Sequence, residues 1–208
     1  MDQANLMQQF QTKKADFITA FKALEIAQTQ QRFKRSLNQE KGIENLLGVG
    51  LDIPSAYRLG MHTESFAWID RAIPSGSSNI IAYALPYNNF NVPETFIQDI
   101  VAARDSVVKI HIPGPDVPGK TTYMKTETVF MPYVTPVEIA GYKGVELRGI
   151  WDIHNYPMAG PFVAYILNDP DQERKIVLEG FVFAPNKEKR IPLFELEAII
   201  KTLHAVNK

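Results

Sequence analysis

The chain has 208 residues, of which 22 are basic and 23 are acidic, and its formal net charge is -1. Binding to a nucleic-acid backbone calls for an excess of positive charge, so we expect no nucleic-acid partner. The absence of cysteine excludes disulfides, thiolate zinc sites, iron–sulfur clusters and cysteine nucleophiles. Because 45% of the residues are apolar and 11% are aromatic, the chain can bury a sizeable core without such crosslinks.

The first predicted element is a long helix from Gln3 to about Leu37, without Pro or Gly. Apolar side chains recur along it at helical spacing, at Leu6, Phe10, Phe17, Phe21 and Leu24. At 1.5 Å per residue this helix is roughly 50 Å long, which exceeds the width of a domain of this size. We expect residues 1–41 to form either a surface helix over one sheet face or the contact of a homodimer through residues 3–37.

Residues 42–208 predict a single α+β domain made of two similar units, at about 49–111 and 122–208. In the first unit, ESFAWIDRAI and SSNIIAYALPY read as two strands joined across the turn PSGS. A helix follows, with Pro93 near its start, and it ends before Ile112-Pro113. The first unit is therefore a hairpin followed by a helix.

The second unit repeats this order at greater length. TTYMKTETVF predicts a strand with one solvated face, and VTPVEIAGYKGVEL predicts a hairpin that turns at Gly141 to Gly144. The stretch from Gly144 to Arg190 predicts three strands rich in aromatic and β-branched residues, which we expect to form the core of the fold. A final helix is predicted from about Pro192 to Val206.

A weak internal repeat links the two units. IAYALPYNNFNVPETFIQDIVAARD, starting at Ile81, aligns without a gap to GFVFAPNKEKRIPLFELEAIIKTLH, starting at Gly180. The alignment is also compatible with chance, because Pro-initiated helices often follow apolar strands. The resulting prediction is an antiparallel sheet with pseudo-twofold character, in which the helices pack on one face and a long N-terminal helix is added.

One segment, GPDVPGKT from Gly114 to Thr121, matches the phosphate-binding pattern G-x-x-x-x-G-K-[ST]. Such a loop must leave a strand and enter a helix, so that backbone N–H groups face the phosphates. Here a predicted helix precedes the segment and a predicted strand follows it, while Pro115 and Pro118 remove two N–H donors. We interpret the segment as a stiff connector between the two units.

No pattern specifies a reaction. The histidines are scattered without metal-ligand spacing, and no G-x-S-x-G occurs, so we expect no metal and no cofactor. The loop from His154 to Pro161 is the best candidate for ligand binding, because loops at strand ends often bind ligands, and polar or aromatic residues outside it are added as candidates. These candidates are Tyr123, Arg148, Asp152, His154 and Tyr156; the alternative for each is an ordinary polar or core position.

Several segments in fixed order resemble an uncharacterised bacterial family known only as a domain of unknown function. They are FAWIDR, IIAYALPY, ARDSVVKIHIPGP, YMKTE, ELRGIWDI, MAGPFVAYILND and EGFVFAPNKEKR, and the similarity runs from about Phe33 to Lys208. The resemblance implies an association with cell-envelope lipoproteins, hence a place in the periplasm or on the outer surface. The N-terminus shows no signal-peptide pattern, so we expect a C-terminal piece of such a protein or a divergent short form.

Three hypotheses about function follow. The first is a non-catalytic binding or structural module of the bacterial cell envelope, with a protein, glycan or lipid partner. The second is a hydrolase-type enzyme built around Arg148, Asp152 and His154, which requires these side chains to converge within hydrogen-bonding reach. The third is an assembly domain that dimerises through the N-terminal helix.

Overall fold

The computed structural model describes residues 3–90 and 92–206, with only the backbone for 3–6 and 8–11. The predicted apolar positions Leu6 and Phe10 therefore lie outside the described side chains. Helix α1 (Gln3–Phe33) comes first, and the short helix α2 (Gly42–Leu47) follows it. The chain leaves α1 before the predicted end at Leu37, because Leu37 forms a β-bridge with Pro54.

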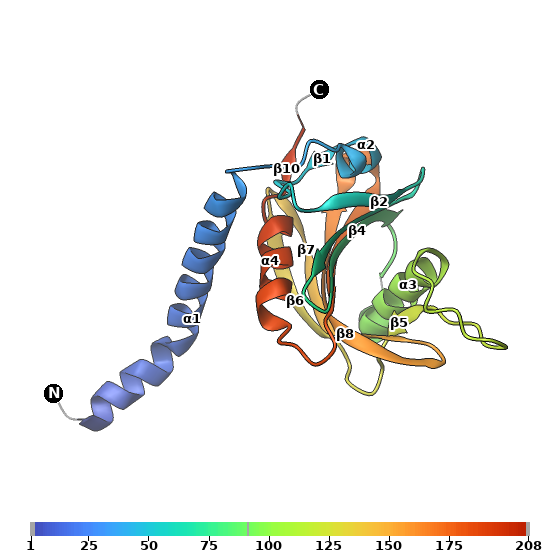
Figure 1. Cartoon of the computed structure of the whole chain (residues 1–208). Helices are drawn as coiled ribbons and strands as arrows, with labels where there is room; N and C mark the ends of the chain where they lie inside the picture. Colours follow the sequence, from blue (N-terminus) through green and yellow to red (C-terminus); the bar gives the residue numbers. More distant parts are fainter. Residues whose placement is uncertain (1–2, 91, 207–208) are drawn as a thin grey trace.

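A curled, mostly antiparallel sheet forms the body of the molecule (Figure 1). Eight strands of the described residues belong to it, in the order β2-β3-β4-β9-β8-β7-β5, with β6 also paired to β7. Their bounds are β2 (Arg58–His62), β3 (Phe66–Ile73), β4 (Gly76–Pro86), β5 (Met124–Thr126), β6 (Tyr133–Ile139), β7 (Tyr142–Ile153), β8 (Tyr156–Asp169) and β9 (Arg174–Phe183). Within the described residues, every pairing between neighbouring strands is antiparallel.

The predicted hairpins are present, although the second one turns at Ala140 and Gly141 and not at Gly141 to Gly144, since Gly144 already pairs with Val137. Strands β3 and β4 pair from Phe66↔Tyr83 to Ile73↔Gly76, which confirms the predicted hairpin across PSGS. Strands β6 and β7 meet at Ala140 and Gly141, whose φ angles of 52° and 86° are both positive. Two positive φ values fit the right-handed twist of a two-residue hairpin, and glycine adopts them without strain. The predicted strand TTYMKTETVF is shorter than expected, because only Met124–Thr126 pair with β7.

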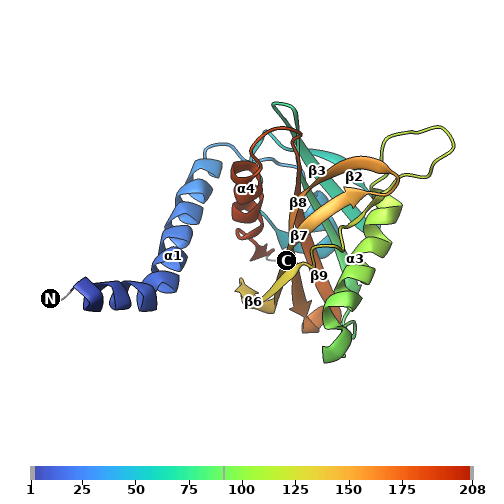
Figure 2. The same cartoon turned by 90° about the horizontal axis from the view of Figure 1, so that it is seen from below.

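The two longer helices that follow α1 lie on opposite faces of the sheet, which corrects the prediction of helices on one face (Figures 1 and 2). Helix α3 (Phe96–His111) packs on the face that includes Ile81 and Tyr83. Helix α4 (Arg190–Ile200) packs on the face that includes Ile80 and Ala82. Successive residues of β4 thus point into two different cores, as the alternation of a strand requires.

The opposite placement of the helices also corrects the predicted pseudo-twofold relation. In the order β3-β4-β9-β8, the hairpins β3–β4 and β8–β9 occupy equivalent places on either side of the central β4–β9 pair. A twofold axis perpendicular to the sheet would relate them in this way. That axis would keep both helices on one face, whereas α3 and α4 lie on different faces. The aligned residues Ile81 and Gly180 accordingly face α3 and α4 respectively. No rotation superimposes the two units, so the aligned segments share only a local strand-then-helix order.

The C-terminal helix ends earlier than the predicted Val206. Helix α4 stops at Ile200, and the chain then forms β10 (His204–Ala205), which pairs with β1 (Val49–Gly50). The backbone of this small second sheet thereby satisfies the hydrogen-bonding groups that follow α4. Helix α1 lies beside α4, on the side away from the sheet (Figures 1 and 2), and places a second helical layer over this face.

Candidate functional site

Two of the predicted site residues meet at the end of the sheet where β7 turns into β8. The rings of Tyr123 and His154 stack with centroids 4.8 Å apart, and the His154 backbone N–H donates to the Tyr123 carbonyl at 2.9 Å. The ammonium of Lys109 lies 4.8 Å from the centre of the Tyr123 ring. Tyr156 follows in the next strand and is 38% exposed. This group is a surface aromatic pair with one nearby cation.

Asp152 and Arg148 belong to other interactions. The Asp152 carboxylate pairs with Lys125 at 3.0 Å across the β5–β7 ladder, and its Oδ1 is buried without a hydrogen-bond partner. Arg148 instead donates to Glu146 at 2.5 Å and to Glu197 of α4 at 2.6 Å. Four residues along a strand separate two side chains by roughly 13 Å, although they share a face.

The hydrolase hypothesis required Arg148, Asp152 and His154 to converge. Among the described residues, no hydrogen bond or ion pair joins any two of the three. Strand spacing separates Arg148 from Asp152, and an irregularity in the register between Asp152 and Ile153 precedes His154. The structure therefore gives this hypothesis no catalytic arrangement.

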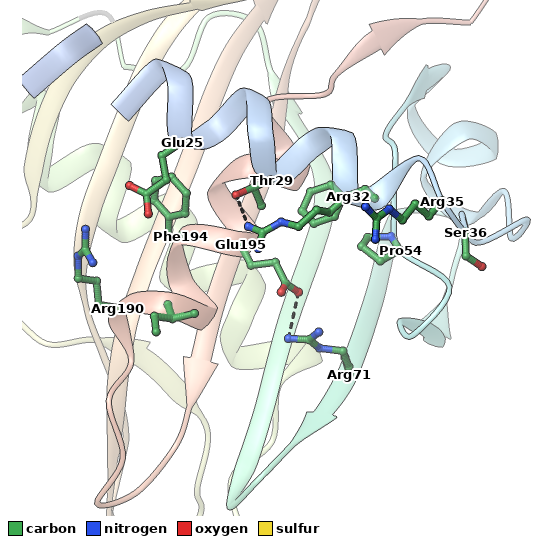
Figure 3. A pocket seen from close by; sticks show the side chains of 12 residues that line it. Glu25, Thr29, Arg32, Arg35, Ser36, Pro54, Arg71, Arg190, Phe194 and Glu195 are labelled. Atoms are coloured by element: carbon green, nitrogen blue, oxygen red, sulfur yellow. Dashed lines mark hydrogen bonds and ion pairs between the residues drawn. The ribbon is translucent and has the colours of Figure 1, made fainter. Parts of the chain in front are cut away.

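A different site lies between α1 and α4. It is a groove with a cavity volume of about 380 Å³, and Figure 3 shows its lining side chains. Both helices form its walls, and β3 with the segment after α1 forms its floor. The lining residues are Glu25, Thr29, Arg32, Phe33, Arg35, Ser36, Pro54, Arg71, Arg190, Ile191, Phe194 and Glu195. A volume of this size lies within the range of ligand pockets.

Helix α1 is held against the body by one side only. Thr29 and Phe33 are buried, and Ile26 packs on the core behind α4. Two polar contacts add to this seam: the Gln30 amide donates to the Ala198 carbonyl at 3.0 Å, and Lys22 pairs with Glu197 at 2.7 Å. A spacing of three or four residues keeps these side chains on one helix face. The groove opens beside this seam, where α1 passes the first turns of α4.

The floor of the groove holds a carboxylate and a guanidinium that form an ion pair with each other. Glu195 accepts a hydrogen bond from the Tyr57 hydroxyl at 2.8 Å and pairs with the Arg71 guanidinium at 3.0 Å. That guanidinium lies 5.0 Å from the centre of the Tyr57 ring. Burial, together with the nearby Glu195 carboxylate, raises the pKa of Tyr57, so this phenol stays protonated and donates. The Glu195 carboxylate is thereby satisfied within the protein.

The rim of the groove carries three arginines that lack a carboxylate partner. Arg32 donates to the Thr29 hydroxyl at 2.8 Å, which orients its guanidinium, but it forms no ion pair with a described carboxylate. Within residues 3–90 and 92–206, the same holds for Arg35 and Arg190. Glu25 is the one acidic lining residue besides Glu195. The groove therefore has an excess of positive charge above an apolar lining of Phe33, Ile191 and Phe194.

The lining of the groove suits the binding of an anion. The lining includes no histidine, and the one lining serine, Ser36, bonds to the hydroxyl of Ser55 at 2.8 Å rather than to a base. No group of three or more metal-ligating side chains occurs in the described part of the chain. Guanidinium groups bind carboxylates and phosphates through paired hydrogen bonds, and an apolar lining adds contact area. The groove can hold an anion that also carries an apolar group.

No local sequence pattern indicates this groove. Its arginines are scattered over positions 32, 35, 71 and 190, and they come together only because α1 packs on α4. The apolar pattern of α1 predicted burial somewhere, but not the surface that it covers. The periodicity within one helix does not show which other helix it packs against.

The family of domains of unknown function DUF4837 matches residues 36–202. The chain belongs to this family. The DUF4837 match begins just after α1, so the groove joins a helix outside the matched residues to α4 inside them. The match confirms the predicted resemblance to a domain of unknown function, and it says nothing about lipoproteins or the cell envelope.

Two solved structures are similar to this DUF4837 chain. The Ran-binding protein Mog1p of Saccharomyces cerevisiae aligns with a TM-score of 0.45 and 8% identity, over 77% of this chain and 91% of that one. A Mog1 mutant aligns with a TM-score of 0.43 and 8% identity, over 77% and 92%. No curated protein matches the chain. In the described residues, every helix is too short or too polar to cross a membrane.

Proposed function

We propose that the chain is a non-catalytic binding module that holds an acidic, partly apolar peptide segment of a partner protein in the groove between α1 and α4. One observation carries the proposal. Arg32, Arg35 and Arg190 surround an apolar lining and have no carboxylate partner among the described residues. All three arginines are exposed, so each guanidinium is accessible to a peptide carboxylate, which it can bind through paired hydrogen bonds.

The chemistry of the groove selects the ligand class. Aspartate or glutamate side chains match the planar guanidinium groups, and an aromatic or aliphatic side chain fits against Phe33 and Phe194. A cavity of about 380 Å³ holds only a few side chains. The contact is therefore small, and we expect a dissociation constant of about 10–100 µM, which is typical of a weak and reversible contact.

Fluorescence polarisation with labelled peptides tests the proposal. The probe is a pool of N-acetylated hexapeptides that each contain one aromatic residue and two aspartates, and the control pool carries asparagine in place of aspartate. We expect the acidic pool to bind, the neutral pool to bind at least about tenfold more weakly, and added salt to reduce the difference.

Variants assign the binding to the groove. Arg32→Gln combined with Arg190→Gln should weaken binding of the acidic pool at least about tenfold, because two charge-assisted contacts are lost. Arg58→Gln is the matched control, since Arg58 is an exposed arginine of β2 outside the groove. Equal binding of both pools, or full binding by the double variant, would contradict the proposal.

A place in the bacterial cell envelope is part of the same proposal, and it is supported only by the resemblance of the segments quoted above. Such a location would put the groove among envelope proteins and their exposed acidic segments. Cell fractionation of the natural host with an antibody to the domain measures it. Recovery together with cytoplasmic markers alone would refute the envelope location and leave the groove proposal intact.

A further inference from the structure

The groove between α1 and α4 continues toward the N-terminal half of α1. A second hollow of about 400 Å³, which we call the apolar extension, adjoins it and shares the lining residues Glu25, Arg190 and Phe194 with it. The other residues that line the extension are Ile18, Phe21, Lys22, Arg148, Leu193 and Glu197. Phe21, Glu25 and Arg32 recur at helical spacing, so one side of α1 forms a wall of both hollows.

The apolar extension offers apolar side chains from both of its walls. Phe21 and Ile18 of α1 line it and are 70% and 57% exposed, and Leu193 lines it from α4. Its charged residues beyond the shared ones pair with one another, because Lys22 and Arg148 contact the Glu197 carboxylate at 2.7 and 2.6 Å. A ligand side chain that enters the extension therefore meets mainly apolar surface.

Two groups of opposite charge stand where the groove and the extension meet. Glu25 on α1 and Arg190 on α4 lie at the end of the groove away from Arg35 (Figure 3). Neither forms an ion pair within residues 3–90 and 92–206. A peptide backbone alternates N–H and C=O groups, so it can donate to Glu25 and accept from Arg190. An acyl chain would pass both charges without a polar atom to offer them.

We infer that the acidic peptide of the proposed function continues along α1 into the apolar extension, which binds a second apolar side chain of the same peptide. The inference rests on the proposed function and adds a fixed order to its ligand. The acidic residues lie at Arg32, the backbone crosses beside Glu25, and the second apolar side chain contacts Phe21. The Glu25 carboxylate also repels a further acidic side chain at the crossing.

The length of α1 between these residues sets the spacing of the ligand. Arg32 and Phe21 are roughly 16 Å apart along the helix axis, at about 1.5 Å per residue. An extended peptide rises about 3.3 Å per residue, so its acidic residues and its second apolar residue should be about five residues apart. Binding should therefore depend on the distance between the two parts of the peptide.

Fluorescence polarisation with labelled peptides of defined spacing tests the inference. Each peptide contains Asp-Asp-Phe, a serine-glycine spacer of increasing length, and then either leucine or serine, and the series is made in both chain directions. We expect the leucine peptide to bind about tenfold more tightly than the serine peptide at a separation of about five residues, because the leucine side chain leaves water. With the shortest spacer the two peptides should bind equally.

Variants of α1 assign this gain to the apolar extension. Phe21→Gln should remove the gain from leucine and leave binding of the serine peptides unchanged, because Phe21 lines the extension and not the groove. Leu24→Gln is the matched control, since Leu24 is a 60% exposed residue of the same helix that lines neither hollow. Circular dichroism confirms that both variants keep their helices. No gain at any spacing, or a gain that persists in Phe21→Gln, overturns the inference.

Backbone N-methylation of the leucine peptide tests the crossing beside Glu25. Methylation of one spacer residue at a time removes single N–H donors, and one position should lose about tenfold in affinity, because a hydrogen bond to a charged group is lost. The loss at this position should fall below about threefold in Glu25→Ala, which has no carboxylate to accept the bond. Equal losses in both proteins at every position would overturn the path along Glu25.

The outcomes separate this inference from the proposed function. Binding of the Asp-Asp-Phe peptides that depends on Arg32 and Arg190, without a gain from leucine, would overturn the inference alone. Failure of every peptide to bind would overturn both. Competition by dodecanoate that Phe21→Gln abolishes, without a gain from leucine, would assign the apolar extension to an acyl chain and overturn the inference.

Discussion

The two faces of the sheet use the same pair of residue types in different surroundings. On the α3 face, Arg104 and Glu179 form an ion pair whose side chains are 2% and 0% exposed. On the α4 face, Arg148 pairs with Glu197 at a similar distance of 2.6 Å, but the arginine is 32% exposed and further cations join the carboxylate. The first pair is sealed inside one core, whereas the second connects separate elements next to a groove.

The buried pair of Arg104 and Glu179 forms its hydrogen bonds within the protein. The Arg104 Nε and Nη2 donate to the two Glu179 oxygens at 2.8 and 2.6 Å, and its Nη1 donates to Thr126 at 2.9 Å. Its guanidinium also lies 4.1 Å from the centre of the Phe162 ring. An arrangement of this kind leaves no donor for a ligand, so it fixes α3 on the sheet and carries no binding role.

The largest predicted effect comes from breaking this sealed pair. Arg104→Met should destabilise the fold by about 3–5 kcal/mol, because it leaves the Glu179 carboxylate buried without its partner. The double variant with Glu179→Leu should recover most of the loss, since removing both charges removes the desolvation cost. Denaturant unfolding followed by far-UV circular dichroism measures both, with Arg58→Met at an exposed position as control.

Equal losses in the single and double variants of this pair would show that packing, and not the unpaired charge, holds α3. In that case the difference between the two faces would concern side-chain volume rather than electrostatics. A loss below about 1 kcal/mol for Arg104→Met would mean that water reaches Glu179, contrary to its complete burial.

The open network predicts a dependence on acid. Burial alone would raise the pKa of Glu197, but hydrogen bonds from Lys201, Lys22 and Arg148 outweigh it and lower this pKa to about 2. The carboxylate therefore stabilises the folded state above its ordinary pKa of 4.5, and this stabilisation is lost as the pH falls from about 4.5 to 2.

Glu197→Gln should accordingly cost on the order of 3 kcal/mol at pH 7 and much less near pH 2, because each unit of pKa shift corresponds to about 1.4 kcal/mol. Urea unfolding at several pH values measures the difference, and Glu188→Gln at an exposed position is the control. A loss that stays constant across pH would show that Glu197 acts through packing alone. Because Lys22 belongs to α1, loss of the network should also loosen the wall of the groove.

Much of the sheet could be predicted, because alternation within one strand records which side chains are buried. Leu147, Trp151 and Ile153 share one parity in the predicted strand and are all buried, and the hairpin of β3 and β4 has its turn at the predicted position. The faces of the helices could not be predicted in this way. Whether α3 and α4 share a face depends on which strands become neighbours, and that is a long-range property of the chain.

The candidate site residues were likewise predictable only where they depend on local sequence. The strand at Tyr123 and the strand that ends near His154 were predicted from local pattern, and the two residues come together because both adjoin the β5–β7 pairing. The arginines of the groove gave no such signal, since charged residues on an exposed helix face usually serve only solubility. Their role depends on α1 lying over α4, and part of that contact is made by the polar residues Thr29 and Gln30, which a hydrophobic pattern does not mark.

The smallest predicted effect concerns the floor of the groove. There the α4 face, like the α3 face, holds an arginine and a glutamate that pair with each other. Tyr57→Phe removes the hydrogen bond to Glu195 but leaves the Arg71 pair in place, so we expect a loss of only about 1 kcal/mol.

The folded-state pKa of Tyr57 is raised above its ordinary value of 10, hence its stabilising contribution is present below pH 10 and is lost as the pH rises further. Urea unfolding at pH 7 and above pH 10 should therefore show a smaller alkaline loss for Tyr57→Phe than for the unchanged chain. Tyr133→Phe, at a tyrosine that is 81% exposed, should change neither value. A loss for Tyr57→Phe as large as that for Arg104→Met would mean that the floor of the groove is sealed as tightly as the α3 core, and that Arg71 is held too rigidly to assist a ligand.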